Sequence, residues 1–363
     1  MKKLFGCLLF AAALTGCQTL HYYGQAVEGQ SRLLLKRRPI SEITSDPESP
    51  EFLRKRLTLI LAAREFAKNE LQLPVANNYL TYVDLGQPYV AWNVFAAPEF
   101  SLTPKTWCYP FVGCAAYRGY FSETNALQYA ESLRKQGYEV YVGGVTAYST
   151  LGWFDDPVLS TFIRFSEAHS ITLIFHELAH QVLYVPDDTA FNESFATFVE
   201  QEGLSRWQNV TGSSRIFSEY LNHNRRQRLF IQLIMQSRRE LELLYQTSLS
   251  PSEKREKKAS IFSELRNEFS RLKSKQSELS AYEDWVNKPL NNAKISSVVA
   301  YHDFVPAFSK LLSGIDGDLN RFYRVCRNLT EKKRDERHRI LRSLVGKEPD
   351  QVREVLRVFH LDS

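Results

Sequence analysis

The chain has few cysteines and little excess charge for its length of 363 residues. Five cysteines are too few for a small scaffold held together by disulfides, and a chain of this length can bury a large core without them. The 46 basic and 41 acidic residues leave a formal charge of only +5. That balance does not indicate a nucleic-acid-binding protein, which gathers basic residues on one face, so no nucleic-acid partner is expected.

Glycine and proline are also scarce, with 16 and 14 residues, which excludes collagen-like and linker-dominated architectures. A hydrophobic share of 44% with 24% charged residues excludes a mainly disordered chain. The composition therefore favours one large globular domain or two smaller ones.

Long apolar runs are missing beyond the N-terminus, so no internal membrane span is expected. At the N-terminus, Lys2 and Lys3 precede an apolar segment over residues 4–14, which is too short to span a bilayer. A short basic stretch followed by such a segment is typical of an export signal.

The sequence Leu-Thr-Gly-Cys at residues 14–17 resembles the lipobox of bacterial lipoproteins. The resemblance implies that residues 1–16 are a signal peptide and that Cys17 is lipidated. An ordinary secretory signal is the alternative. Because Gln18 and not aspartate follows the cysteine, the resemblance implies a lipid anchor in the outer membrane, with the protein facing the periplasm.

Export would place the remaining cysteines in an oxidising compartment. Cys108 and Cys114 lie close together in the sequence, with Pro110 and Gly113 between them. This turn composition predicts a local disulfide between Cys108 and Cys114, and two buried thiols are the alternative. Cys326 lies in an apolar helical pattern and is expected to be a buried, inert thiol.

Hydrophobic periodicity predicts both helices and strands in the first part of the mature chain. Helices are expected over residues 51–73, 122–136, 171–184 and 190–202, and strands over residues 89–95 and 140–146. Asp188 or Thr189 is expected to cap the fourth of these helices, and Gly203 is expected to end it.

Residues 205–285 are highly charged, nearly lack glycine and proline, and are split by Ser250 and Pro251. One face stays apolar, which predicts a long antiparallel helical hairpin. A structural excursion or a lid is favoured over a coil that binds a partner. Residues 286–363 are again helical, and their basic run from 332 to 342 is expected to be a solvated helix face, with contact to anionic lipid as the alternative.

The most informative segment is His-Glu-Leu-Ala-His at residues 176–180. Positions i and i+4 lie on one face of a helix, so the imidazoles of His176 and His180 can reach one zinc ion. Glu177 is then placed to act as a general base. A helix with two satisfied core histidines is the alternative, and the apolar flanks argue against solvated ones.

A catalytic zinc site needs a third protein ligand on a neighbouring element. Glu193 is expected to be that ligand, with twelve residues between it and His180. A Pro-Asp-Asp turn at residues 186–188 would let the second helix fold back on the first.

His176 to Gln181 together with residues 192–200 resemble the gluzincin aminopeptidases, whose sites read HELAHQ and then NEGFA with a later glutamate. The resemblance implies that Glu193 binds zinc and that Glu200 and Asn192 lie just behind the ligands. The spacing is shorter than in that family, and the GxMEN segment that grips the free amine of the substrate is missing.

The chain more closely resembles the predicted zinc aminopeptidase family of Gram-negative lipoproteins, over nearly the whole mature chain. The segments that carry this resemblance are the lipobox, WCYP at 107–110, VGC at 112–114, YRGYF at 117–121, AYSTLGWF at 147–154, the HELAHQ helix and LNNA at 290–293. It implies a helix-rich α+β fold with a zincin-like core.

The expected organisation has five parts. It comprises a signal peptide (1–16), a membrane-proximal tether with a first helix (17–50), a zincin-like catalytic core (51–204), the helical hairpin as an insertion (205–285) and a C-terminal helical part packed on the core (286–363).

Other site residues are less strongly indicated. Residues 143–150 are a candidate edge strand that pairs with substrate backbone, with Tyr148 and Ser149 as substrate-binding residues, and an ordinary strand is an equal alternative. Tyr301, or else Tyr148, is a candidate donor to the oxyanion, although most tyrosines serve packing. Three further histidines are expected to be surface or satisfied residues and not ligands: His169, His223 and His302.

The sequence therefore predicts a Zn²⁺-dependent peptidase that removes N-terminal residues from peptides at the cell envelope. An aminopeptidase needs a carboxylate for the free amine, and the nearest candidates are Asp155, Asp156 and Glu167. The alternatives are a zinc endopeptidase, a cell-wall peptide amidase and a non-catalytic lipoprotein.

Overall fold

The computed structural model describes residues 22–109, 113–147, 149–150, 154–298 and 304–361. In this part the chain is helix-rich α+β, with three small sheets, as expected. The signal peptide and Cys17 lie outside the described residues. No helix in the ranges described has both the length and the apolar character needed to cross a membrane.

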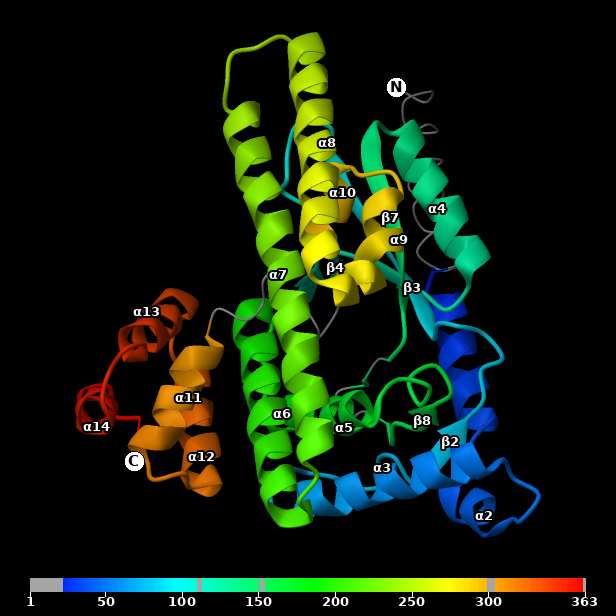
Figure 1. The fold of residues 1–363 in the computed structure, drawn as a ribbon, viewed down its shortest axis with the longest axis vertical. Helices are drawn as coiled ribbons and strands as arrows, with labels where there is room; N and C mark the ends of the chain where they lie inside the picture. Colours follow the sequence, from blue (N-terminus) through cyan, green and yellow to red (C-terminus); the bar gives the residue numbers. More distant parts are fainter. Residues whose placement is uncertain (1–21, 110–112, 148, 151–153, 299–303, 362–363) are drawn as a thin grey trace, which may run out of the picture.

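The largest core surrounds three helices, α3 (Glu51–Asn69), α5 (Glu167–Val182) and α6 (Thr189–Thr211). α5 begins where the Ser166 side chain accepts a hydrogen bond from the His169 backbone N–H, and α6 begins at Asp188, which accepts one from Phe191. α5 and α6 pack against each other in the lower half of the molecule (Figure 1).

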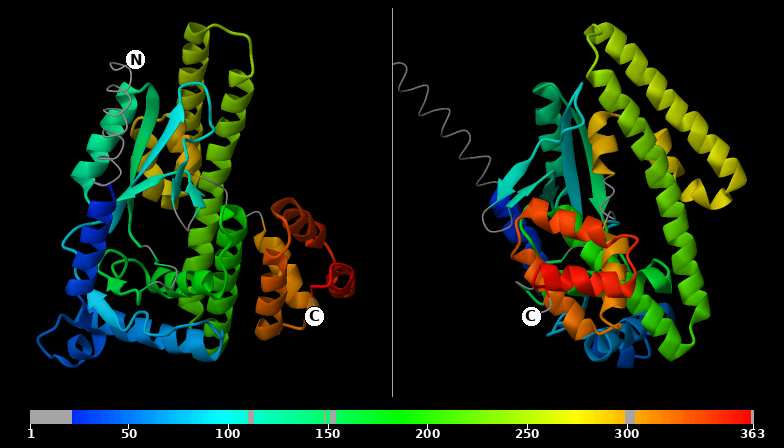
Figure 2. Two further views of the ribbon diagram at one scale, coloured as in Figure 1. Left: turned by 180° about the vertical axis from the view of Figure 1, so that it is seen from behind. Right: turned by 90° about the vertical axis from the view of Figure 1, so that its left-hand side faces the viewer.

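A second layer is the antiparallel sheet β6-β3-β7, formed by Arg118–Tyr120, Ala91–Pro98 and Tyr138–Val145. Alternate side chains of β3 pack on α4 (Glu123–Lys135), and α10 (Asn292–Ser297) contacts β3 and β7 as well (Figure 2). α4 begins at the N-cap Ser122 and ends before Gly137, as the sequence predicts.

The other two sheets are smaller. In one, β2 (Thr81–Val83) pairs with β1 (Arg38–Pro39) in antiparallel fashion and with β8 (Val158–Leu159) in parallel. The other is the hairpin of β4 (Trp107–Tyr109) and β5 (Gly113–Ala115).

The predicted helical hairpin is confirmed as α7 (Ser214–Tyr245) and α8 (Pro251–Lys275). Ser250 forms a capping box with Glu253, and Pro251 occupies the first helical turn. The apolar faces of both helices form a separate core with η1 (Ser277–Tyr282) and α9 (Glu283–Asn287). α7 runs beside α6 at one end and beside the sheet layer at the other (Figures 1 and 2).

The C-terminal helices pack on the side of α6. They are α11 (Val305–Gly314), α12 (Leu319–Thr330), α13 (Arg334–Leu344) and α14 (Pro349–Val358). Phe195 of α6 contacts Phe308 and Phe322 of this group, and Cys326 is a free, fully buried thiol, as predicted.

One sequence expectation needs correction. α6 does not end at Gly203 but continues to Thr211 and ends at Gly212, whose backbone is left-handed. Gly203 is needed for packing, because a Cβ there would meet Phe175 and Leu71 at 2.7 Å. The first helix expected within residues 17–50 is present in the structure.

In that segment, residues 22–35 form a helix and α2 (Ile40–Ser45) follows β1. Leu33, Ile40 and Ile43 are buried in the main core. The segment therefore contributes to the folded body itself.

Candidate metal centre and active site

Two histidines of α5 and one glutamate of α6 converge in the structure. The Nε2 atoms of His176 and His180 lie 3.2 Å apart. The Glu193 carboxylate lies 3.4 Å from the Nε2 atom of His176 and 3.8 Å from that of His180. One donor atom from each residue falls within 4.8 Å of the other two, so the fold brings together the three residues that the sequence singled out.

This donor set suits a zinc ion. Two imidazoles and one carboxylate are a ligand combination of catalytic zinc sites, which leave a fourth position open. Burial opposes protonation of His176, but the carboxylates of Glu193 and Glu200 outweigh it and hold the pKa of His176 well above its ordinary value. The cluster therefore attracts positive charge, and the residues present fit the metal.

The second imidazole behaves differently. Burial and the neighbouring His176 lower the pKa of His180 to about 4, so this ring is neutral near pH 7. A neutral imidazole is the form that binds a metal.

Glu200 lies on the far side of the His176 ring, away from the donor cluster. Its Oε2 is 3.0 Å from His176 Nδ1, and its Oε1 accepts a hydrogen bond from the Tyr220 hydroxyl at 2.9 Å. A carboxylate at Nδ1 fixes the tautomer in which Nε2 keeps its lone pair for a metal. Glu200 therefore lies behind His176, as expected. Tyr220 of α7 was not predicted, because nothing in the local sequence distinguishes it among 18 tyrosines.

Glu177 follows the first histidine and lines a cavity that opens beside the donor cluster. Burial raises its pKa to about 7, with Glu193 adding to the effect and His176 opposing it. A carboxyl group with this pKa both accepts and releases a proton near neutral pH.

Asn192 does not contact the donor cluster; it closes the turn between α5 and α6. Its side-chain oxygen accepts from the Val185 N–H at 2.9 Å, and its amide donates to the Val185 carbonyl at 2.8 Å. The expectation for Asn192 is corrected accordingly: it positions the helix that carries Glu193.

The same turn is held by the C-terminal helices. Asp188 is 1% exposed, and its carboxylate accepts hydrogen bonds from the Arg337 guanidinium, with Nε at 3.0 Å, and from His338 at 2.9 Å. Arg337 is itself only 3% exposed. The basic run of 332–342 is therefore not wholly a solvated face, because Arg337 is buried against Asp188. The two residues are 149 positions apart, so the sequence gives no local sign of this contact.

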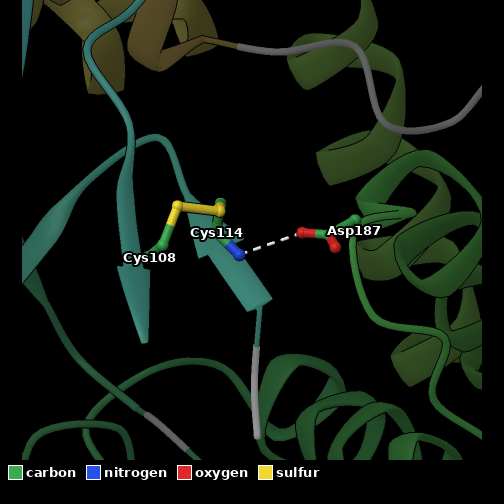
Figure 3. Close-up of a disulfide and its surroundings, with 3 residues drawn as sticks. All are labelled: Cys108, Cys114 and Asp187. Carbon is green, nitrogen blue, oxygen red and sulfur yellow. Dashed lines mark hydrogen bonds between the residues drawn. A yellow bond between two sulfur atoms is a disulfide. The ribbon is translucent and has the colours of Figure 1, made fainter. Parts of the chain in front are cut away.

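A disulfide hairpin holds this turn from another side. Cys108 and Cys114 are joined in the predicted disulfide across β4 and β5. The backbone N–H of Cys114 donates to the Asp187 carboxylate at 2.9 Å (Figure 3). Asp187 precedes Asp188, so the turn contacts two segments that are distant in the sequence.

The three candidates for amine recognition are all engaged elsewhere. The Asp156 carboxylate accepts from Ser149 Oγ and from the backbone and hydroxyl of Thr150. Glu167 forms an ion pair with Arg215 at 2.5 Å, and Asp155 lies 3.5 Å from the Asn77 amide.

Ser149 thus contacts Asp156, and its role in substrate binding stays a prediction. β7 lies at the edge of its sheet, as expected of the candidate substrate-pairing strand. Tyr148, Tyr301 and His302 lie outside the described residues.

A cavity of about 680 Å³ opens beside the donor cluster. Most of its lining residues come from α5, α6 and α7, among them His176, Glu177 and Glu193, and later segments of the chain add a few more. His169 and His223 line it too, away from the donor cluster. The helical hairpin is therefore a wall of the candidate active site.

Residues 21–341 match the family model described as "Putative aminopeptidase". Comparisons with curated proteins and with solved structures gave no match. The family match includes both helices of the donor cluster, the disulfide hairpin and the Arg337 contact. Because it covers most of the chain, the chain belongs to the putative aminopeptidase family.

Proposed function

We propose that this protein is a zinc-dependent aminopeptidase anchored by lipid at the cell envelope. The observation that carries the proposal is the convergence of His176, His180 and Glu193 beside the half-buried Glu177, in a member of an aminopeptidase family. His176, His180 and Glu193 would hold the ion. Zinc supplies a Lewis acid that polarises a peptide carbonyl and makes water more acidic.

The side chains of this chain supply the proton transfers and the positioning. Glu177 takes a proton from the attacking water on its carboxylate and passes it to the nitrogen of the departing amine. Glu200 holds His176 in one tautomer, and Tyr220 fixes Glu200. Asn192 and Asp188 fix the start of the helix that carries Glu193.

The proposed location rests on the sequence. The lipobox-like residues 14–17 and the disulfide Cys108–Cys114 are both consistent with an exported lipoprotein. Cys17→Ser should release the protein from the membrane fraction. Unchanged membrane association would refute the anchor.

The test of the activity compares a peptide with its N-acetylated form, using zinc-loaded protein. Release of single N-terminal residues from the free-amine peptide alone supports an aminopeptidase. No hydrolysis of either peptide by fully zinc-loaded protein would refute the proposed peptidase activity.

An endopeptidase is the second candidate, and one observation favours it. Asp155, Asp156 and Glu167, the three carboxylates expected to receive a substrate amine, all contact other groups of the protein. Equal cleavage of both peptides at an internal bond would establish this alternative.

A further inference from the structure

The cavity beside the donor cluster has an aromatic end formed by the hairpin region. Phe230 of α7 stacks on Tyr282 with ring centroids 4.3 Å apart and planes 9° apart, and Trp285 meets Phe230 edge-on at 5.1 Å. Phe230 and Tyr282 both line the cavity. Phe230 is 6% exposed, so this part of the wall is held in place by packing.

Aliphatic side chains line other parts of the cavity. Leu173 of α5, Ile231 of α7 and Val298 after α10 are among the lining residues. Leu173 lies one turn before His176 on α5, so the apolar lining is continuous with the donor cluster.

Apart from Glu177 and Glu193 at the donor cluster, the charged groups that line this cavity are paired or solvated. Glu200 contacts His176 and Tyr220, and Glu219 pairs with Arg215 at 2.6 Å. Arg228 is exposed to solvent. Burial lowers the pKa of His169, so its ring is neutral near pH 7. The lining residues thus offer little to a charged side chain.

We infer that this cavity binds a bulky apolar or aromatic side chain of the peptide substrate, next to the bond that is cut. The inference rests on the proposed function, because it takes the scissile bond to lie at His176, Glu177 and Glu193. A volume of about 680 Å³ readily holds an indole ring, and burying such a ring against apolar walls favours binding. Ile231 and the stacked pair of Phe230 and Tyr282 then set the substrate preference.

The experiment measures binding and does not need turnover. Calorimetry with zinc-loaded Glu177→Gln protein compares Trp-Gly-Gly and Gly-Trp-Gly with Gly-Gly-Gly and Lys-Gly-Gly. At least one tryptophan peptide should bind about tenfold more tightly than the glycine and lysine peptides. Ile231→Trp fills the cavity and should reduce that preference to about threefold or less.

Leu243→Trp is the matched control, because Leu243 lies on the same helix, is 67% exposed and does not line the cavity. It should keep the full preference. Gln227→Trp fills the cavity from a half-buried position and replaces Ile231→Trp if that variant does not fold.

Equal binding of tryptophan and glycine peptides, or a preference that survives both cavity-filling variants, would overturn the inference. Binding of the lysine peptide as tightly as the tryptophan peptides would also overturn the inference. Absence of hydrolysis by the wild type with an intact tryptophan preference would refute the proposed function alone.

Discussion

The pair α5–α6 and the hairpin α7–α8 are both long helical pairs, but they are specified in different ways. α5 and α6 carry the donor cluster, and local sequence marks it, through the HELAH motif and the residues Asn192 and Glu193. The hairpin is a charged amphipathic pair with a core of its own. It reaches the donor cluster through Tyr220 and the cavity wall, which only the folded structure reveals.

The difference shows that the donor residues can be recognised from local sequence, whereas the residues that hold them in place cannot. The spacing of His176 and His180 is fixed by helix geometry, so it can be recognised in the sequence alone. The supports of the site come from the hairpin, the disulfide segment and the C-terminal helices, at separations of 20 to 149 residues. Substitutions of the ligands and of the supporting residues should therefore have separable effects on activity, zinc binding and stability.

The largest effect is expected at the general base. Glu177→Gln should lower kcat by about a thousandfold while zinc content stays at the wild-type level, because the residue moves protons and is not a ligand. Metal analysis and peptide hydrolysis on the same samples measure both. Glu202→Gln, on α6 and paired with Arg206, is the control and should change neither. Loss of zinc from Glu177→Gln would show that the residue binds the metal.

Removal of Arg337 should destabilise the fold strongly. Arg337→Ala leaves the buried Asp188 without its main partner, which costs about 3 kcal/mol of unfolding free energy. Urea unfolding measures the loss. Arg334→Ala is the control, since Arg334 is exposed and 4.0 Å from Asp188. Equal stability of the two variants would remove the C-terminal helices as a support of the turn.

The same contact should depend on pH. Burial raises the pKa of Asp188, but hydrogen bonds from Arg337 and His338 outweigh it and lower the pKa below its ordinary value. The stabilisation is therefore fully present above the unfolded pKa of about 3.9 and is lost as the pH falls through the lower folded pKa. The stability difference between wild type and Arg337→Ala should shrink in acid below that range. A difference in unfolding free energy that grows in acid would contradict the proposed stabilisation of ionised Asp188 by Arg337.

A smaller effect is expected where the hairpin contacts the donor cluster, at Tyr220. Tyr220→Phe removes the hydrogen bond to Glu200 and should weaken zinc binding about tenfold, measured by competition with a chelator. Tyr245→Phe on the same helix loses its bond to Asn292, far along the hairpin, and should leave zinc affinity unchanged. The role of Tyr220 is refuted if both variants bind zinc like the wild type.

The smallest effect is expected on the outer face of the hairpin. Arg271 pairs with Glu268 on α8, and both lie on the solvated side. Arg271→Ala should leave the unfolding midpoint and the zinc affinity unchanged, because exposed ion pairs contribute little. A clear loss of either would mean that this face contacts something essential.

Local signals were enough to predict the helix starts near Ser122 and Asp188, the split of the hairpin at Ser250 and the donor residues, since caps and periodicity act within a few residues. They failed at Gly203, where close packing of Phe175 and Leu71, and not a helix end, requires glycine. They also failed at Arg337, because its partner Asp188 is 149 residues away. Long-range contacts of this kind leave no periodic pattern in a single sequence.

The most direct test of the account is a crystal structure of the zinc-soaked protein with anomalous data at the zinc edge. We expect one strong peak bonded to Nε2 of His176, Nε2 of His180 and the carboxylate of Glu193, with Glu200 still on Nδ1 of His176. A peak bonded to Glu200 with Glu193 turned away, or no peak at this cluster, would contradict it.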